Sequence, residues 1–342
     1  MIQKISRISI LLVLSILILS SCKRRLKGQK ESSYGNTSEI MVVTDNRDQW
    51  ESTIGDSTKS ILAAPMVGLP QSEPHFKLMN VGKNNFNELF RKSRNILILD
   101  IDNNIKEPLL TTEKDKYVIP QRIVTIKAPN QKELLQYFRQ NAIGIVELFN
   151  KSERDRIVNT YKSIQDVETE AAIQKKFDIE MVIPEGFFIA VDKPNFVWLR
   201  KETADFSQGI LIYTENYYSS NQLSPEHIIA YRDSLTSAYL PGENPNTYMI
   251  IEQRKKAGPP VFDTIPNLNQ HYTVRTRGLW KLFNDFYGGP FTSYSIIDEK
   301  NNRIVTVDGF VYAPKKKKRD YVKQLDAILY NVKIKNKAAA KK

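Results

Sequence analysis

Short apolar runs alternate with amphipathic stretches in the first half of the chain. The runs are bounded by polar or turn-forming residues, as expected of buried strands, and cover residues 40–43, 75–81, 95–101 and 121–128. An amphipathic stretch at residues 49–62 follows the first run, and Asn130 with Glu133 fits a helix-capping pair after the last. The βαβ-like order predicts a small α/β layer domain over residues 39–150.

Residues 131–177 carry the pattern of consecutive helices. Ser152 and Asp155 provide a second start signal, which predicts two helices with a boundary near residue 152. The second helix is heavily charged. We therefore expect a helical connector at residues 151–178 that bridges the two halves of the protein and keeps one face in water.

From residue 179 to residue 332, strand-like runs follow one another closely. Ser224 before Pro225 predicts the start of one helix, because Ser is a good cap and Pro is favoured at the first helical position. Apolar residues on one face predict a last helix at residues 316–330. The pattern favours an antiparallel α+β sandwich, so the expected fold class is α+β, with an N-terminal α/β domain, a long helical connector and a C-terminal antiparallel domain.

The N-terminus has a pattern of its own. Lys4 and Arg7 precede an apolar run at residues 8–19, which suits a signal peptide and is shorter than the ~20 residues of a spanning helix. The run ends in LSSC, which resembles the lipobox of bacterial lipoproteins. This resemblance implies removal of residues 1–21 and acylation (palmitate-type) of Cys22. The polar composition after the cysteine, which has no periodicity, predicts a flexible tether over residues 22–38. The alternative is a short N-terminal membrane helix with an incidental cysteine.

The chain is basic. Its 342 residues include 50 Lys and Arg against 38 Asp and Glu, a formal charge of +12. Without Lys4 and Arg7 the balance is 48 against 38, or +10. A signal peptide argues against nucleic acid as the partner, so the charge indicates solubility or attraction to anionic envelope surfaces. Two basic stretches stand out: residues 315–319, expected to form a solvated face at the start of the last helix, and a frayed tail at 333–342.

Few residue patterns point to catalysis. The chain has three histidines with no second His at helical spacing and a single cysteine, so neither a metal nor a cofactor is predicted. No nucleophile elbow or phosphate-binding glycine loop is present. Asp100 and Asp102 flank the end of a strand, where α/β proteins often present functional groups. They are either a carboxylate pair for glycan or cell-wall hydrolysis, or the cap of a turn.

Aromatic residues gather in the second half of the chain. Trp280, Tyr287 and Phe291 lie near a Gly-Gly-Pro turn and are candidates for a surface that stacks on sugar rings or holds a partner protein. The alternative is that they form the core of the sandwich, since alternating aromatic residues along a strand are what a core requires.

Several stretches resemble a family of lipoproteins of unknown function from Bacteroidota. They are EIMVVT (39–44), MVGLPQSEP (66–74), RNILI (94–98), YGGPF (287–291) and DGFVYAP (308–314). The second half also resembles PsbP-like domains in the order of its elements, which implies a binding or assembly role by analogy of fold. Lipoproteins exposed on such cells often have acidic residues after the cysteine, whereas Lys23, Arg24 and Arg25 follow here.

These observations together favour a lipid-anchored, periplasm-facing envelope protein. It is expected to bind an envelope protein or glycan, or to maintain the envelope, without catalysing a reaction. The competing hypothesis is the carboxylate-dependent hydrolase.

Overall fold

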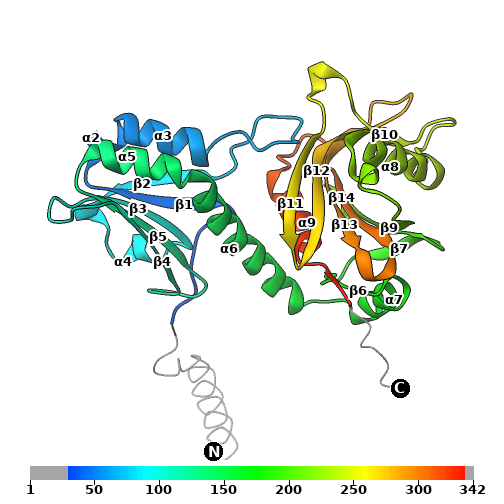
Figure 1. Cartoon of the computed structure of the whole chain (residues 1–342), viewed down its shortest axis with the longest axis horizontal. Helices are drawn as coiled ribbons and strands as arrows, with labels where there is room; N and C mark the ends of the chain where they lie inside the picture. Colours follow the sequence, from blue (N-terminus) through cyan, green and yellow to red (C-terminus); the bar gives the residue numbers. More distant parts are fainter. Residues whose placement is uncertain (1–29, 336–342) are drawn as a thin grey trace, which may run out of the picture.

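The computed structural model describes residues 30–335, so the predicted signal peptide and Cys22 lie outside the described residues. Over this part of the chain there are eight α-helices and fifteen strands. Figure 1 shows two sheets side by side, one built from the first half of the chain and one from the second. The α+β class predicted from the sequence is confirmed. No helix within residues 30–335 is long and apolar enough to span a membrane.

The N-terminal sheet is mostly parallel, with the strand order β2-β1-β3-β5-β4. Only β4, an edge strand, runs antiparallel to its neighbour. Its alternating and largely exposed residues gave no buried run, which is why the sequence pattern missed it. The strands are β1 (Glu39–Thr44), β2 (Lys77–Gly82), β3 (Asn95–Ile101), β4 (Leu109–Lys114) and β5 (Arg122–Ala128).

Helices cover both faces of this sheet. On one face, α3 and α5 bury a core with alternate residues of β1, β3 and β5. On the other face, a smaller cluster packs against Phe86 and Phe90 of the α4 region. Asn130 caps α5 as predicted, because its side chain accepts a hydrogen bond from the backbone N–H of Glu133 at 3.0 Å. The helices are α2 (Arg47–Trp50), α3 (Thr53–Leu62), α4 (Glu88–Arg91) and α5 (Gln131–Gln140).

The segment before β1 is partly fixed to this domain. Ser32 bridges to Ile119 and Tyr34 to Ser93, and Ser38 is fully buried. The expectation of a flexible tether through residue 38 is therefore wrong, since backbone hydrogen bonds hold the chain from about residue 31 onward. The eight residue steps from Cys22 to Lys30 can span at most about 29 Å.

Between the sheets, α6 (Ala142–Lys162) runs without a break and is followed by α7 (Val167–Phe177). The predicted helix start at Ser152 is wrong, because Ser152 lies in the middle of α6 and accepts a hydrogen bond from Arg122. The first turns of α6 pack on the N-terminal core through Ile145 and Phe149, and later turns contact α9.

The charged part of α6 is not a solvated face, contrary to expectation. Glu153, Arg154 and Arg156 are all less than 10% exposed. Their burial is tolerated because each is paired: Arg156 with Glu153, and Arg154 with Asp326 of α9 at 2.9 Å. The connector is thus part of the contact between the domains.

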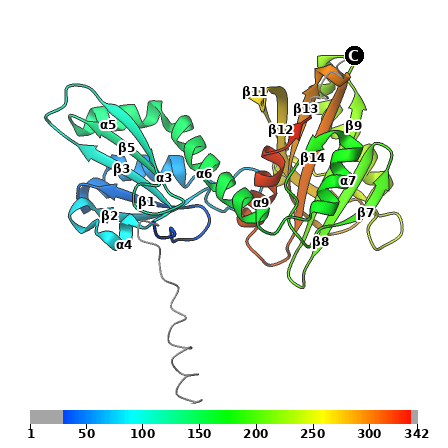
Figure 2. The ribbon, with the colours of Figure 1, turned by 90° about the horizontal axis from the view of Figure 1, so that it is seen from below.

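The C-terminal sheet is antiparallel and curled (Figure 2), with the strand order β10-β12-β13-β14-β9-β8-β7 and β11 added beside β12. The Pro-containing segment that forms β11 has no strand pattern in its sequence. It forms a strand because it pairs with β12. The strands are β7 (Phe188–Lys193), β8 (Phe196–Glu202), β9 (Ser207–Asn216), β10 (Met249–Ile251), β11 (Val261–Leu268), β12 (His271–Leu282), β13 (Gly288–Asp298) and β14 (Arg303–Tyr312).

Two helices cover opposite faces of this sheet. α8 (Pro225–Tyr239) begins at Pro225 with Ser224 as its cap, as predicted, and packs on one face. α9 (Arg319–Tyr330) packs on the other face together with α7. A two-stranded pair of β6 (Ile179–Glu180) and β15 (Lys333–Ile334) closes the domain, so the tail predicted from residue 333 is ordered at its start.

The basic stretch at residues 315–319 is not a solvated face throughout. Lys318 and Arg319 are about 5% exposed, and their backbone N–H groups donate to the Glu73 carboxylate at 2.6 and 3.3 Å. A carboxylate at the start of a helix is favourable because it meets free N–H groups and the positive end of the helix dipole. Glu73 belongs to the N-terminal domain, so the two domains share this cap.

Candidate functional site

One row of aromatic side chains lies on the face of the C-terminal sheet that α8 covers. Alternate residues of a strand point to the same face, and this row takes residues from β8, β12 and β14 and from the hairpin before β13. Its rings follow one another at centroid distances of 5.3–6.3 Å, in the order Trp198, Phe310, Trp280, Tyr312 and Tyr287.

Two glycines make room for these rings. A Cβ on Gly209 would lie 2.2 Å from the ring of Phe310, its partner across β9 and β14. A Cβ on Gly289 would lie 2.0 Å from the carbonyl oxygen of Val311 and 3.1 Å from the indole nitrogen of Trp280. Larger residues at either position would push the aromatic row out of place.

The row lines an open pocket beyond the end of α8, which we call the aromatic pocket. It has a volume of about 370 Å³. Because α8 ends at Tyr239, the helix covers Phe196 and Tyr213 but leaves the rest of the face uncovered. The segment after α8 forms one wall, and Arg200 and Glu202 form a charged rim.

Two polar groups in this pocket have no hydrogen-bond partner in the described part of the chain. They are the indole N–H of Trp198 and the Nε–H of Arg200, and both atoms are shielded from solvent. The guanidinium of Arg200 lies 5.4 Å from the centre of the Trp198 ring. A shielded donor without an acceptor is costly, so an acceptor on a bound molecule would be favourable here.

The sequence-predicted aromatic residues have different places. Trp280 is 5% exposed and donates to the carbonyl of Val311 at 3.1 Å, so it forms the floor of the pocket. Tyr287 is 39% exposed and stands at the rim. Phe291 is buried in the core, with the Arg232 guanidinium 4.4 Å from its ring centre.

Trp198, Arg200 and Tyr312 were missed by the sequence reasoning. The alternation of Phe196, Trp198 and Arg200 along one strand could have identified Trp198 and Arg200. These three residues lie on one face of β8, and that face changes from apolar to charged along the strand.

A buried ion pair lies below the aromatic row. Arg232 of α8 donates to Asp308 of β14 at 2.8 and 3.2 Å, and both residues are fully buried. Burial alone raises the pKa of the Asp308 carboxyl, and the adjacent guanidinium opposes that rise. The pair joins α8 to β14 of the sheet.

The hairpin between β12 and β13 extends the aromatic surface. Phe286, at its tip, is fully exposed, and the partly exposed Phe283 stacks on Tyr248 with ring centroids 5.0 Å apart. Exposed aromatic residues beside a pocket are typical of contact surfaces.

Asp100 and Asp102 lie at the end of β3, apart from this pocket. Asp100 pairs with Lys83 and, at 3.3 Å, with Lys127. Asp102 accepts hydrogen bonds from the backbone and side chain of Asn104, both at 3.0 Å, which lowers its pKa and caps the turn. Both carboxylates thus face a lysine.

The histidines lie apart and have partners of different kinds: an asparagine for His75, a glutamate for His227 and a backbone carbonyl for His271. Within residues 30–335, no group of three or more His, Cys, Asp or Glu side chains has the arrangement of a metal site.

Comparisons with known proteins give matches to families and to structures. No curated protein matches the chain. The Saccharomyces cerevisiae Ran-binding protein Mog1p is 12% identical, with 46% of this chain and 90% of that chain covered at a TM-score of 0.31. The human StarD13 lipid transfer and protein localization domain is 10% identical, with 47% and 93% covered at a TM-score of 0.20. Such low TM-scores carry no argument.

Two family models match most of the described chain. Residues 33–162 match a domain of unknown function (DUF8532), and residues 166–331 match a second (DUF4837). The two matches meet within the turn between α6 and α7. They agree with the resemblance to a family of unknown function, while an origin in Bacteroidota and a PsbP-like fold stay predictions. The chain is thus similar to two domains of unknown function, DUF8532 in its first half and DUF4837 in its second.

Proposed function

We propose that this protein is a lipid-anchored envelope factor that acts by binding a partner protein in the aromatic pocket, not by catalysis. The observation that carries the proposal is the pocket itself: a row of Trp, Tyr and Phe beside Arg200, with two shielded donors that lack acceptors.

The residue types favour a protein partner. Trp, Tyr and Arg are the residues that contribute most at protein interfaces, especially around a pocket. A large apolar side chain of the partner would fill the pocket over Trp280, and a backbone carbonyl would accept from Trp198 or Arg200. The fully exposed ring of Phe286 extends the surface beyond the pocket, which suits a partner larger than a single sugar.

The anchor rests on the sequence. Acylation of Cys22, removal of residues 1–21 and a periplasm-facing position are inferred from the lipobox resemblance and the basic residues after the cysteine. With the chain held from about residue 31, the N-terminal domain would lie within about 29 Å of the lipid. The partner would then be a protein close to the membrane.

The hydrolase alternative has no observation in its favour. Asp100 and Asp102 face Lys127, which compensates their charge.

Site-specific photocrosslinking in intact cells tests the binding proposal. A photoreactive amino acid at position 286 is expected to give a discrete protein adduct. The same group at position 218, where Tyr218 is 80% exposed outside the pocket, serves as the matched control. Trp198→Leu, with folding checked by circular dichroism, should weaken the adduct roughly tenfold or more.

The binding proposal fails if positions 286 and 218 give the same adducts, or if the adduct at 286 is unchanged in Trp198→Leu. Recovery of a sugar or lipid in place of a protein would also overturn it. The anchor is tested separately, by labelling with an alkyne fatty acid. Cys22→Ser should abolish the label and release the protein from membranes, and retention of either would contradict the anchor.

A further inference from the structure

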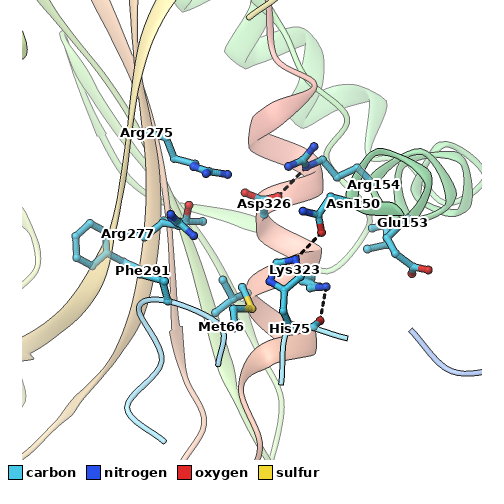
Figure 3. A pocket seen from close by; sticks show the side chains of 14 residues that line it. Met66, His75, Asn150, Glu153, Arg154, Arg275, Arg277, Phe291, Lys323 and Asp326 are labelled. Carbon is cyan, nitrogen blue, oxygen red and sulfur yellow. Dashed lines mark hydrogen bonds and ion pairs between the residues drawn. The ribbon is translucent and has the colours of Figure 1, made fainter. Parts of the chain in front are cut away.

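A second cavity lies between the two domains, away from the aromatic pocket. Its walls come from α6, α9, strands β12 and β13, and the segment of the N-terminal domain around Met66 and His75 (Figure 3). We call it the interdomain cavity. Its volume of about 40 Å³ is enough for roughly three water molecules. A small oxyanion is of similar size.

Most of the charges around this cavity are compensated. Arg154 pairs with Asp326 at 2.9 Å and with Glu147 at 2.7 Å. Arg275 and Arg277 share Asp263 of β11, at 3.2 and 2.6 Å.

The two carboxylates in the wall are engaged to different degrees. Asp326 accepts from Arg154 and Tyr294. Glu153 accepts from Asn95 and Arg156 through Oε1, while its Oε2 has no hydrogen-bond partner among the described residues. In Figure 3 the Glu153 carboxylate points away from Lys323.

His75 adds no positive charge at neutral pH. Burial, followed by the nearby Lys323, lowers its pKa to about 3. Its Nε2 lies 2.7 Å from the side-chain oxygen of Asn150.

Lys323 differs from the other charged residues of the wall because it has no partner of opposite charge among the described residues. It is 6% exposed, yet within residues 30–335 no carboxylate lies within ion-pair distance of its ammonium group. Its contacts are the carbonyl of His75 at 2.9 Å and the ring of Phe76 at 4.2 Å. A buried ammonium group without a counter-charge is strongly unfavourable.

Two groups in the wall that can donate hydrogen bonds also have no partner among the described residues. They are the Nε of Arg277 and the hydroxyl oxygen of Thr292, both shielded from solvent. Arg277 and Thr292 are paired across β12 and β13, so their side chains leave the same face of the sheet. In Figure 3, Arg275 and Arg277 enter from the strand side, Arg154 from α6 and Lys323 from α9.

We propose that the interdomain cavity binds a small oxyanion, either a free phosphate-like ion or the phosphate of an ester, and that the ion joins the two domains. Its oxygens would accept from the ammonium of Lys323, the Nε–H of Arg277 and the hydroxyl of Thr292. This would compensate the buried lysine and the unpartnered donors together. A cation is disfavoured, because the excess charge of the wall is positive.

Isothermal titration of the whole chain with sodium phosphate, at constant ionic strength against sodium chloride, tests this proposal. We expect saturable binding at one site and a rise in Tm that follows occupancy. Lys323→Met and Arg277→Gln should each weaken binding roughly tenfold or more. Lys281→Gln is the matched control, because Lys281 also belongs to β12 but pairs with Glu252 away from the cavity.

A parallel titration with glycerol phosphate distinguishes the two sources. Binding of inorganic phosphate alone supports a free ion, whereas equal binding of the ester supports a phosphorylated ligand. The proposal is overturned if neither probe binds, or if Lys281→Gln loses as much affinity as the two cavity variants. Because direct binding to the unmodified chain is measured first, a variant that fails to fold leaves the test intact.

Discussion

Buried charges are paired differently on the two faces of the C-terminal sheet. On the α8 face the only buried charges at the core are Arg232 and Asp308 among the described residues, and they neutralise each other beneath an open aromatic pocket. On the α9 face, Arg154 of α6 pairs with Asp326 of α9, and the buried Lys323 has no carboxylate within ion-pair distance among the described residues. Successive residues of β12 and β13 contribute to both faces.

The difference shows which face is balanced in charge. On the α8 face the charges of Arg232 and Asp308 cancel each other, although the Nη1 of Arg232 has no hydrogen-bond partner among the described residues. A buried unpaired cation is not satisfied by the chain itself. The face that contacts the N-terminal domain is therefore the one whose stability should respond to pH and to added anions.

Breaking the buried ion pair between Arg232 and Asp308 should have the largest effect on the free energy of unfolding. Asp308→Ala leaves Arg232 buried and uncompensated, which should lower the free energy of unfolding by about 3–5 kcal/mol in urea denaturation. Asp56→Ala, at a pair with an Asp side chain 73% exposed, should change it by less than about 0.5 kcal/mol. The paired replacement Arg232→Met with Asp308→Leu should recover much of the loss. A loss below about 1 kcal/mol in Asp308→Ala would contradict the comparison.

The unpaired lysine should make stability depend on pH. Burial lowers the pKa of Lys323 to about 7, helped by Arg319, while Glu153, Asp320 and Asp326 oppose the shift. Between pH 7 and the ordinary lysine pKa of about 10.4, the unfolded chain binds the additional proton. Raising the pH from 7 to 9 should therefore increase stability by about 2–3 kcal/mol in a buffer free of phosphate and sulfate.

Two comparisons check that this effect belongs to Lys323. Lys323→Met should abolish the pH effect, which urea denaturation at each pH will measure. Sulfate, which stays fully ionised over this range, should flatten the curve of the unmodified chain by holding the lysine in its charged form. If Lys323→Met and the unmodified chain respond equally to pH, the charge is balanced by another group.

Filling the space under the aromatic row should have a moderate effect on the free energy of unfolding. Gly209→Ala places a methyl group against the ring of Phe310 and should cost about 1–3 kcal/mol in thermal unfolding. Trp198 fluorescence should change as the row shifts. Gly144→Ala, at a helical position with nothing within 4 Å, should instead stabilise the protein by about 0.5–1 kcal/mol. Equal responses at the two glycines would mean that packing is not the cause.

The smallest effect on stability should come from the rim of the pocket. Tyr287→Ala removes a ring that is 39% exposed, so it should lower the unfolding free energy by about 1 kcal/mol or less. The same change should weaken the crosslink from position 286, because the ring forms part of the contact. A large loss of stability would mean that Tyr287 belongs to the core, as Phe291 does.

Much of the local structure could be predicted from the sequence. The strand at residues 95–101 and the caps Asn130 and Ser224 were confirmed, because each depends on neighbouring residues only. The strands β4 and β11 were missed, because their regularity comes from a partner strand. Of the candidate site, Trp280 and Tyr287 were named, but Trp198 and Arg200 were not, because curling of the sheet brings β8 and β12 to one pocket.

The sequence by itself determined the class of fold, the places of its strong strands and helices, and the inference of a lipid anchor at Cys22. These follow from periodicity, capping and a short motif, which act over a few residues. Tertiary structure alone decided which charges are buried and which are solvated. Arg154, Lys318 and Arg319 belong to stretches with the composition of a water-facing surface, yet they are buried because their partners come from distant parts of the chain. Whether a charge can be buried depends on the partner it meets, and that is set only when the two domains pack together.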